Sequence, residues 1–179
     1  MLPVILSILV VLIVVLLVLI VLQPNEVRYT RSTTVNAPAS AVFPLINDFH
    51  KWTDWSPWEK LDPNTRKMYG GPDSGVGSTY AWEGNKNVGS GHMKILESHP
   101  HMLVRIALEF LKPIKGSNIT DFTFEEKNGT TVVTQTMSGP NSLMGKVMGL
   151  IMDMDKKMIG PNFEKGLADI KAIAEGAAK

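Results

Sequence analysis

Residues 102–137 read MLVRIALEFLKPIKGSNITDFTFEEKNGTTVVTQTM, and their pattern is that of three consecutive strands. Apolar and polar residues alternate within each segment, which places apolar side chains on one face of a sheet and charged ones on the other. Residues 127–129 (Lys-Asn-Gly) separate the last two segments, and an Asn-Gly pair favours a tight hairpin. The stretch therefore predicts an antiparallel sheet with strands over 102–111, 117–126 and 130–137. One face of this sheet should be exposed to solvent.

More strand segments precede this stretch. Residues 26–36 (EVRYTRSTTVN) are rich in Val, Tyr and Thr, which favour strands. Three further segments of the same character, at 66–69, 78–83 and 89–97, are bounded by Gly, Pro, Asn and Asp residues that favour turns. The chain thus carries enough strands to form one large sheet.

Two regions have the helical period instead. Residues 39–46 place Val and Ile at helical spacing, and residues 48–58 predict a compact helical turn and loop with three tryptophans. From Ser142 to the C-terminus a long helix is expected, with a broad apolar face that covers the sheet. Gly160-Pro161 should kink or restart this helix, because proline disrupts a helix interior but is tolerated at a first position. This order of elements predicts an α+β fold.

The N-terminus is a continuous apolar segment. Residues 4–22 (VILSILVVLIVVLLVLIVL) contain only one polar side chain and would span roughly 28 Å as a helix, which matches the hydrocarbon core of a bilayer. We interpret residues 1–23 as a single transmembrane anchor and residues 24–179 as one domain. The rival interpretation is a cleaved secretory signal. Against it stand the absence of Lys or Arg before the segment, its length, and the lack of a small-residue cleavage motif after Leu22.

Charge and cysteine content narrow the functional classes. The net charge is +1 with basic and acidic residues interspersed, so no nucleic-acid-binding surface is indicated. The chain has no Cys, which excludes a disulfide framework and a lipid-modified cysteine. Arg28 and Arg31 follow the apolar segment closely, and the positive-inside tendency then places the domain in the cytoplasm.

The ordered set of motifs in the predicted domain resembles the START-like helix-grip (SRPBCC) superfamily, in its polyketide cyclase/dehydrase and lipid transport branch. The resemblance covers nearly the whole domain. It implies a curved seven-stranded antiparallel sheet wrapped around a long C-terminal helix, with a cavity for apolar ligands between them. The residues that carry it are RSTTVNAP (31–38), Val42-Phe43, Asn47-Asp48, WTDWSPW (52–58), GVGSTYAWEGN (75–85) and MDMDKKM (152–158).

Inward-facing residues of the predicted elements supply the candidates for the cavity wall. Each pair from one predicted strand shares a face by alternation, and the methionines of the C-terminal helix give an adaptable apolar surface, although they also suit an ordinary core. The candidate ligand-binding residues are Arg31, Tyr80, Trp82, Phe122, Phe124, Met144, Met148 and Ile151. Thr134 and Thr136 are further candidates, although the parity of their strand is ambiguous.

The sequence indicates no catalytic site and no metal site. No acid-base pair falls on an inward face, so the catalytic residues stay unknown. The four His residues share no ligand spacing and have no Cys to complete a site, and neither a metal nor another cofactor is expected. Trp52, Trp55 and Trp58 are interpreted first as anchors of the short helices on the sheet, and alternatively as a gate for a ligand or as residues at a membrane interface.

Three functions remain open at this point. The first is a membrane-tethered module that binds or transports an apolar small molecule or lipid in the sheet-helix cavity. The second is a cyclase- or hydrolase-type enzyme that uses polar groups such as Tyr80 and Arg31 in the same cavity. The third is an interaction or regulatory module with a filled core and no ligand. Neither a protein partner nor a ligand identity can be named from the sequence.

Overall fold

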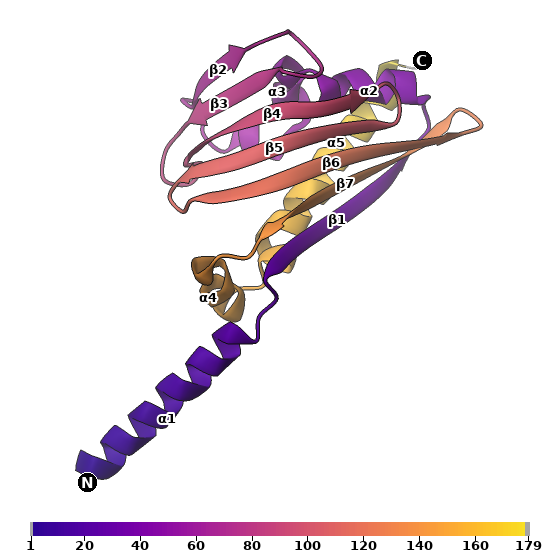
Figure 1. Cartoon of the computed structure of the whole chain (residues 1–179). Helices are drawn as coiled ribbons and strands as arrows, with labels where there is room; N and C mark the ends of the chain where they lie inside the picture. Colours follow the sequence, from indigo (N-terminus) through magenta and orange to yellow (C-terminus); the bar gives the residue numbers. More distant parts are fainter. Residues whose placement is uncertain (1, 178–179) are drawn as a thin grey trace.

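The computed structural model describes residues 2–177, and its centre is one seven-stranded antiparallel sheet in the spatial order β1-β7-β6-β5-β4-β3-β2 (Figure 1). Consecutive strands from β2 to β7 are neighbours, and β1 forms an edge beside β7. This confirms the predicted antiparallel sheet. The strands are β1 (Glu26–Val35), β2 (Arg66–Gly70), β3 (Thr79–Glu83), β4 (Ser90–His99), β5 (Leu103–Lys112), β6 (Gly116–Lys127) and β7 (Thr130–Pro140).

Helices cover the concave face of the curved sheet. The C-terminal helix α5 runs obliquely across this face and packs on β1, while α2 and α3 pack against α5 (Figure 1). The fold is thus the α+β helix-grip arrangement. The helical segments are α1 (Leu2–Val21), α2 (Ala39–Asn47), η1 (Phe49–Lys51), α3 (Trp52–Trp55), η2 (Pro57–Lys60), α4 (Leu143–Ile151), the π-helical turn η3 (Asp155–Ile159) and α5 (Gly160–Ala177).

The β6–β7 hairpin forms where the Asn-Gly pair predicts it. Asn128 has a φ of 54° and Gly129 a φ of 75°, and a two-residue hairpin turn of this kind needs positive φ at both central positions. Lys127 pairs directly with Thr130 across the turn. The turn fixes the register of the two longest strands, so it fixes which of their side chains face the helices.

The best-packed part of the core lies under α2 and α3. Phe122 of β6 has no exposed surface, and its ring lies 6.1 Å from that of Trp52 and 6.2 Å from that of Trp55, measured between centroids. Phe124, two residues along the same strand, packs its ring 5.5 Å from that of Phe43 in α2. These contacts fill this half of the concave face with side chains.

The C-terminal helical region differs from the expectation of one long helix with a kink at Gly160-Pro161. The chain leaves the helical conformation at Met152, and Asp153 caps the new start by accepting a hydrogen bond of 3.1 Å from the Lys156 backbone N–H. Pro161 sits in the first turn of α5, where its missing N–H costs little. The wider turn η3 precedes it and closes with a bond from the Gly160 N–H to the Asp155 carbonyl. Helix α4 is therefore a separate element.

Helix α1 projects away from the domain (Figure 1). It is long and apolar enough to cross a membrane by length and composition, and these properties fit a membrane anchor and also an N-terminal signal sequence. Ile20 is its one buried residue among those the structure describes, and the helix contacts α4. The other described side chains of α1 are exposed, as expected for a helix that makes few contacts with the domain.

Candidate ligand-binding cavity

A cavity of about 340 Å³ lies between the concave face of the sheet and the helices. Strands β3 to β7 form its floor, η2, η3 and the start of α5 form its roof, and the β3–β4 and β5–β6 turns border it. Its wall is mainly aromatic and aliphatic, as in sites that hold apolar small molecules. The sheet contributes Tyr80, Trp82, Met93, Leu108, Phe110, Thr120, Gln135 and Met137, and the helices contribute Trp52, Trp55, Trp58, Glu59, Met158, Ile159, Asn162 and Phe163.

The cavity exists because side-chain size changes along β6. Phe124, Phe122 and Thr120 alternate inward on this strand, and all three are buried. The two phenylalanines meet α2 and α3 and leave no space, whereas the short Thr120 lines the cavity. The cavity therefore remains open at Thr120, where the inward side chain of β6 is small.

All four tryptophans of the chain line the cavity. The indole N–H of Trp52 donates to the Ile46 carbonyl at 3.0 Å, and that of Trp55 donates to the Leu45 carbonyl at 2.8 Å. These bonds join α3 to α2, which agrees with the interpretation of the tryptophans as anchors of the short helices. The same rings form the cavity wall, so anchoring and lining are combined.

A row of stacked rings crosses β2 and β3, and its members Tyr80 and Trp82 line the cavity. The rings of Tyr69 and Tyr80 lie 5.2 Å apart, and those of Tyr80 and Trp82 lie 6.0 Å apart. Trp82 lies over Gly91 of β4, its register partner, where a Cβ atom would come within 2.5 Å of the indole ring. Glycine at this position thus lets the Trp82 ring lie flat against the sheet beside the cavity.

Three charged side chains reach the cavity wall, and Glu59 is the least exposed of them, whereas Lys86 and Lys112 are exposed. The side chain of Glu59 in η2 is 8% exposed, and its Oε1 accepts a 2.6 Å hydrogen bond from the Tyr80 hydroxyl. Its Oε2 is paired with the Lys67 ammonium but has no hydrogen-bond partner of good geometry. A buried carboxylate held by a phenol and an ammonium forms a polar end of this mainly apolar cavity.

Burial raises the pKa of all three tyrosines above the ordinary value of 10.0, and for Tyr80 the hydrogen bond to Glu59 raises it further. The folded state therefore favours neutral phenols. This stabilisation is present below the ordinary pKa and is lost as the pH rises through the higher folded values. We expect near-ultraviolet absorbance to show that the tyrosines of the native protein are mostly neutral at pH 10.0. In denaturant the same tyrosines should be about half ionised at that pH. A native midpoint at the ordinary value would contradict the buried hydrogen bond.

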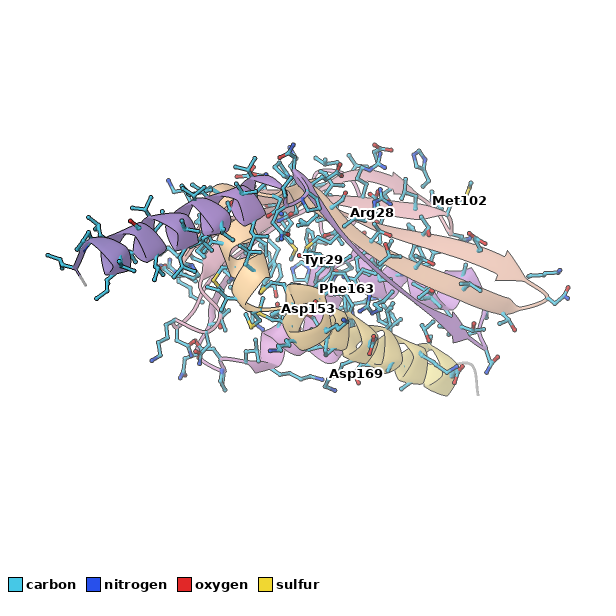
Figure 2. All side chains as sticks on the ribbon, turned by 90° about the horizontal axis from the view of Figure 1, so that it is seen from below. Arg28, Tyr29, Met102, Asp153, Phe163 and Asp169 are labelled. Atoms are coloured by element: carbon cyan, nitrogen blue, oxygen red, sulfur yellow. The ribbon has the colours of Figure 1, made fainter. Side chains whose placement is uncertain are left out.

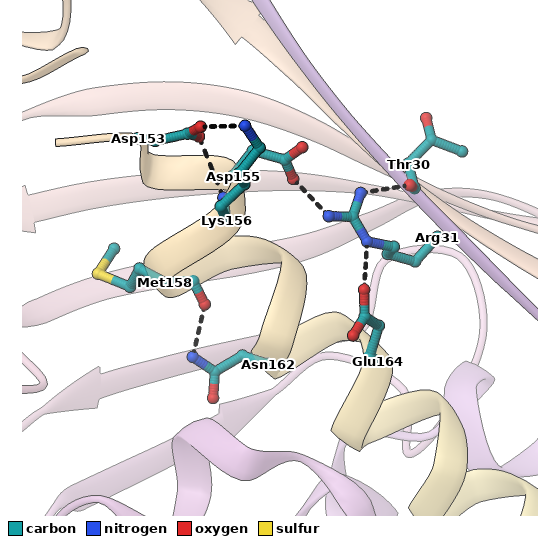
Figure 3. A network of polar contacts seen from close by, with 8 residues as sticks. All are labelled: Thr30, Arg31, Asp153, Asp155, Lys156, Met158, Asn162 and Glu164. Atoms are coloured by element: carbon teal, nitrogen blue, oxygen red, sulfur yellow. Dashed lines mark hydrogen bonds and ion pairs between the residues drawn. The ribbon is translucent and has the colours of Figure 1, made fainter. Parts of the chain in front are cut away.

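Arg31 does not line the cavity. Its guanidinium turns to the helices, where it donates to Glu164 at 2.7 Å and to Asp155 at 2.9 Å, as Figure 3 shows. A third bond runs to the Thr30 carbonyl at 2.9 Å. Arg31 therefore ties β1 to the junction of η3 and α5. Figure 2 shows Tyr29 and Phe163 in the same space between β1 and α5.

The remaining predicted lining residues divide into two groups. Tyr80 and Trp82 line the cavity. Phe122 and Phe124 face inward but lie under α2 and α3, and Met144, Met148 and Ile151 lie on α4, so none of these five is part of the wall. The methionine lining comes instead from Met93, Met137 and Met158.

Other wall residues had no clear sequence signal. Glu59 follows the three tryptophans in a segment without strand or helix periodicity, so its direction could not be assigned. On β7 the inward residues are Gln135 and Met137, which resolves the ambiguous parity against Thr134 and Thr136; Thr136 instead meets Thr30 on the outer face. Counting residues along β7 from the Asn-Gly turn would have shown which of its side chains face the helices.

Within residues 2–177, no group of three His, Asp or Glu side chains is placed to hold a metal ion. The polar groups at the cavity are the Glu59 carboxylate, the Tyr80 phenol, the exposed Lys86 and Lys112, and scattered neutral side chains. This arrangement can hold an apolar body and bind one polar group at the Glu59 end.

Solved structures share this fold at low sequence identity. The Zhui aromatase/cyclase from Streptomyces sp. R1128 superposes with a TM-score of 0.64 at 14% identity, over 86% of this chain and 96% of that chain. The di-domain ARO/CYC StfQ from the steffimycin biosynthetic pathway gives 0.65 at 11% identity, over 86% of this chain and 52% of that chain. Protein CV1439 from Chromobacterium violaceum gives 0.55 at 17% identity, over 86% and 99%. These likenesses establish the fold.

A family model described as polyketide cyclase/dehydrase and lipid transport matches residues 26–175. No curated protein matches the chain. The matched range covers the whole sheet, the cavity and α5 almost to its end, and excludes α1. The chain therefore belongs to the polyketide cyclase/dehydrase and lipid transport family.

Proposed function

We propose that this protein is a membrane-tethered module that binds or transports a hydrophobic small molecule or lipid in the sheet-helix cavity. The observation that carries the proposal is the cavity of about 340 Å³ with its aromatic and aliphatic wall. This volume falls in the range of small-molecule sites, which favours a ligand over the alternative of a module with a filled core. The family and the aromatase/cyclase neighbours support a fold built around a cavity for hydrophobic ligands.

The proposed ligand is mostly apolar and carries one polar group. Most of its surface would lie against Trp82, Leu108 and Met137, and one hydroxyl or similar donor would lie at the end of the cavity formed by Glu59 and Tyr80. Glu59 is already bound by Tyr80 and Lys67, so a donor on the ligand would share the carboxylate with these two groups. A molecule with a flat or flexible apolar body and one hydroxyl fits this wall.

Residues 1–23 serve as the tether in this proposal, and residues 24–179 form the binding domain. Helix α1 contacts α4, so in this proposal the tether meets the domain at α4. A tether beside the bilayer keeps the cavity where apolar ligands accumulate. Arg28 and Arg31 favour the cytoplasmic side, and this placement stays a prediction.

Tryptophan fluorescence tests the proposal, since all four tryptophans line the cavity and none lies in α1. The full chain in nanodiscs is titrated with dibrominated stearate, whose bromines quench on contact. Saturable quenching is the expected result. Quenching that rises only in proportion to the probe in the bilayer would reject a binding cavity.

Glu59→Gln tests the polar end of the site. The amide still accepts the Tyr80 hydrogen bond but lacks the charge, so binding of naphthol should weaken by about tenfold, as for loss of a charged hydrogen bond. Binding of naphthalene should stay unchanged. Equilibrium dialysis against loaded nanodiscs measures both. Equal losses for the two probes would show that Glu59 does not recognise a hydroxyl.

A cyclase-type enzyme is the second candidate, and the observation that favours it is also Glu59. A carboxylate within a cavity is placed where a general base acts on a bound substrate. Such an enzyme would turn over a poly-β-keto substrate, and Glu59→Gln would abolish turnover while the dibrominated stearate still bound. If the chain binds the stearate but turns over no such substrate, the enzyme is rejected and the binding module is retained.

A further inference from the structure

Helix α4 exposes its apolar residues instead of burying them. The exposed fractions are 71% for Leu143, 51% for Met144 and 75% for Ile151, and no residue of α4 is buried. Lys146 is its only charged residue. A nine-residue helix of this composition would normally pack on a core, and apolar exposure on this scale marks a contact surface.

The position of α4 is fixed at the exit of α1. The Asn141 backbone N–H donates to the Asn25 carbonyl at 2.8 Å, and the Asn141 side chain donates to the Pro24 carbonyl at 2.9 Å. Lys146 then donates to the Asn25 side chain at 2.7 Å. These bonds join the start of α4 to the segment that directly follows the apolar helix, and α4 also contacts α1 itself.

We infer that α4 is an interfacial helix that lies in the headgroup region of the bilayer crossed by α1, with Leu143, Met144 and Ile151 facing the lipid. The inference rests on the proposed tether. A helix bonded to residues 24 and 25 lies within a few residues of the point where α1 leaves the hydrocarbon core, so bilayer and exposed face are necessarily close. The occupant of this face is a lipid surface, continuous with the one around α1.

This placement also directs the cavity toward the membrane. Met158 and Ile159 of η3, which follows α4, line the cavity, and so do Lys112 at the end of β5 and residues 113–114 of the β5–β6 turn. The turn lies at the end of the domain nearest α1, whereas the β6–β7 hairpin lies at the far end (Figure 1). Leu111 and Ile114 beside this turn are 46% and 45% exposed. An apolar ligand then passes from lipid into the cavity between η3 and this turn.

Site-specific fluorescence tests the inference, because the chain has no native Cys to interfere. An environment-sensitive label is placed singly by Met144→Cys, Ile151→Cys, Leu12→Cys and Lys127→Cys, all at exposed side chains. Full chain in nanodiscs is then exposed to lipids with nitroxides near the headgroups and, separately, to aqueous iodide. Leu12 reports whether α1 is inserted, and Lys127 reports the far end of the domain.

We expect headgroup nitroxides to quench the labels at 144 and 151 severalfold more strongly than the label at 127, and iodide to show the reverse order. Iodide quenching at 144 and 151 equal to that at 127, with the label at 12 protected, overturns the inference and leaves the tether intact. Iodide access at 12 as well overturns the tether and the inference together.

A rate measurement tests the entry route separately. Ile151→Asp should slow transfer of dibrominated stearate from vesicles to the cavity severalfold, with unchanged quenching at equilibrium. The matched control is Val132→Asp, which adds the same charge on the outer face of β7. Equal rates for the two variants and the unaltered chain would overturn the role of α4 in ligand entry.

Discussion

Thr120→Phe is expected to weaken binding of dibrominated stearate by about 10- to 100-fold, since a ring forced into occupied space costs about 1–3 kcal/mol. Thr120 lines the cavity and makes no side-chain hydrogen bond among those the structure describes, so the substitution removes nothing that holds the fold. The new ring extends the inward row of Phe122 and Phe124 into the space that the ligand would occupy. Tryptophan quenching in nanodiscs measures the loss.

The matched control is Thr123→Phe, the same chemical change on the opposite face of the same strand. It should leave the affinity within about twofold, because its ring stays outside the cavity. Equal effects of the two substitutions would mean that the loss comes from disturbance of β6. Full affinity in Thr120→Phe would place the ligand elsewhere.

Phe122→Ala is expected to lower the free energy of unfolding of the domain by about 3–5 kcal/mol, the usual cost of removing a fully buried phenylalanine. Phe122 has no exposed surface and supports both Trp52 and Trp55. Its loss leaves a void beneath α3, and relaxation of the helix into that void is limited by the two indole hydrogen bonds to α2. Denaturant titration of the full chain in nanodiscs, followed by tryptophan fluorescence, gives the value.

Val132→Ala is the control for this measurement. Val132 is 37% exposed on the outer face of β7, so its truncation should cost less than about 1 kcal/mol. A loss for Phe122→Ala as small as for Val132→Ala would show that the core under α3 is not packed as described. It would also weaken the claim that the cavity is confined to the other half of the sheet.

The sheet could be predicted from the sequence because its signals are local. Alternation along 102–137 and the Asn-Gly turn determine strands, pairing and facing together. The sequence positions of the helices could be predicted, but not how the helices pack in space. The break at Met152 depends on the cap at Asp153, and the exposure of α4 depends on what lies next to it in space. The expectation that this helical face covers the sheet was therefore wrong for α4.

The cavity was harder to predict than the fold. Alternation identifies inward residues, and two of them, Tyr80 and Trp82, line the cavity, but it does not say which inward residues meet a helix and which face a space. Phe122 and Arg31 were selected by the same rule and have other partners. Glu59 comes from an irregular segment, and its burial depends on Tyr80 and Lys67, which are distant in sequence.

Photolabelling tests most directly whether an apolar ligand occupies the cavity. Full chain in native membrane vesicles is irradiated with a diazirine-bearing fatty acid, and the modified peptides are mapped by mass spectrometry. The account predicts saturable adducts on peptides that contain Leu108, Met137 or Met158, competed by unlabelled fatty acid and lost in Thr120→Phe. Adducts confined to α1, without competition, would contradict it.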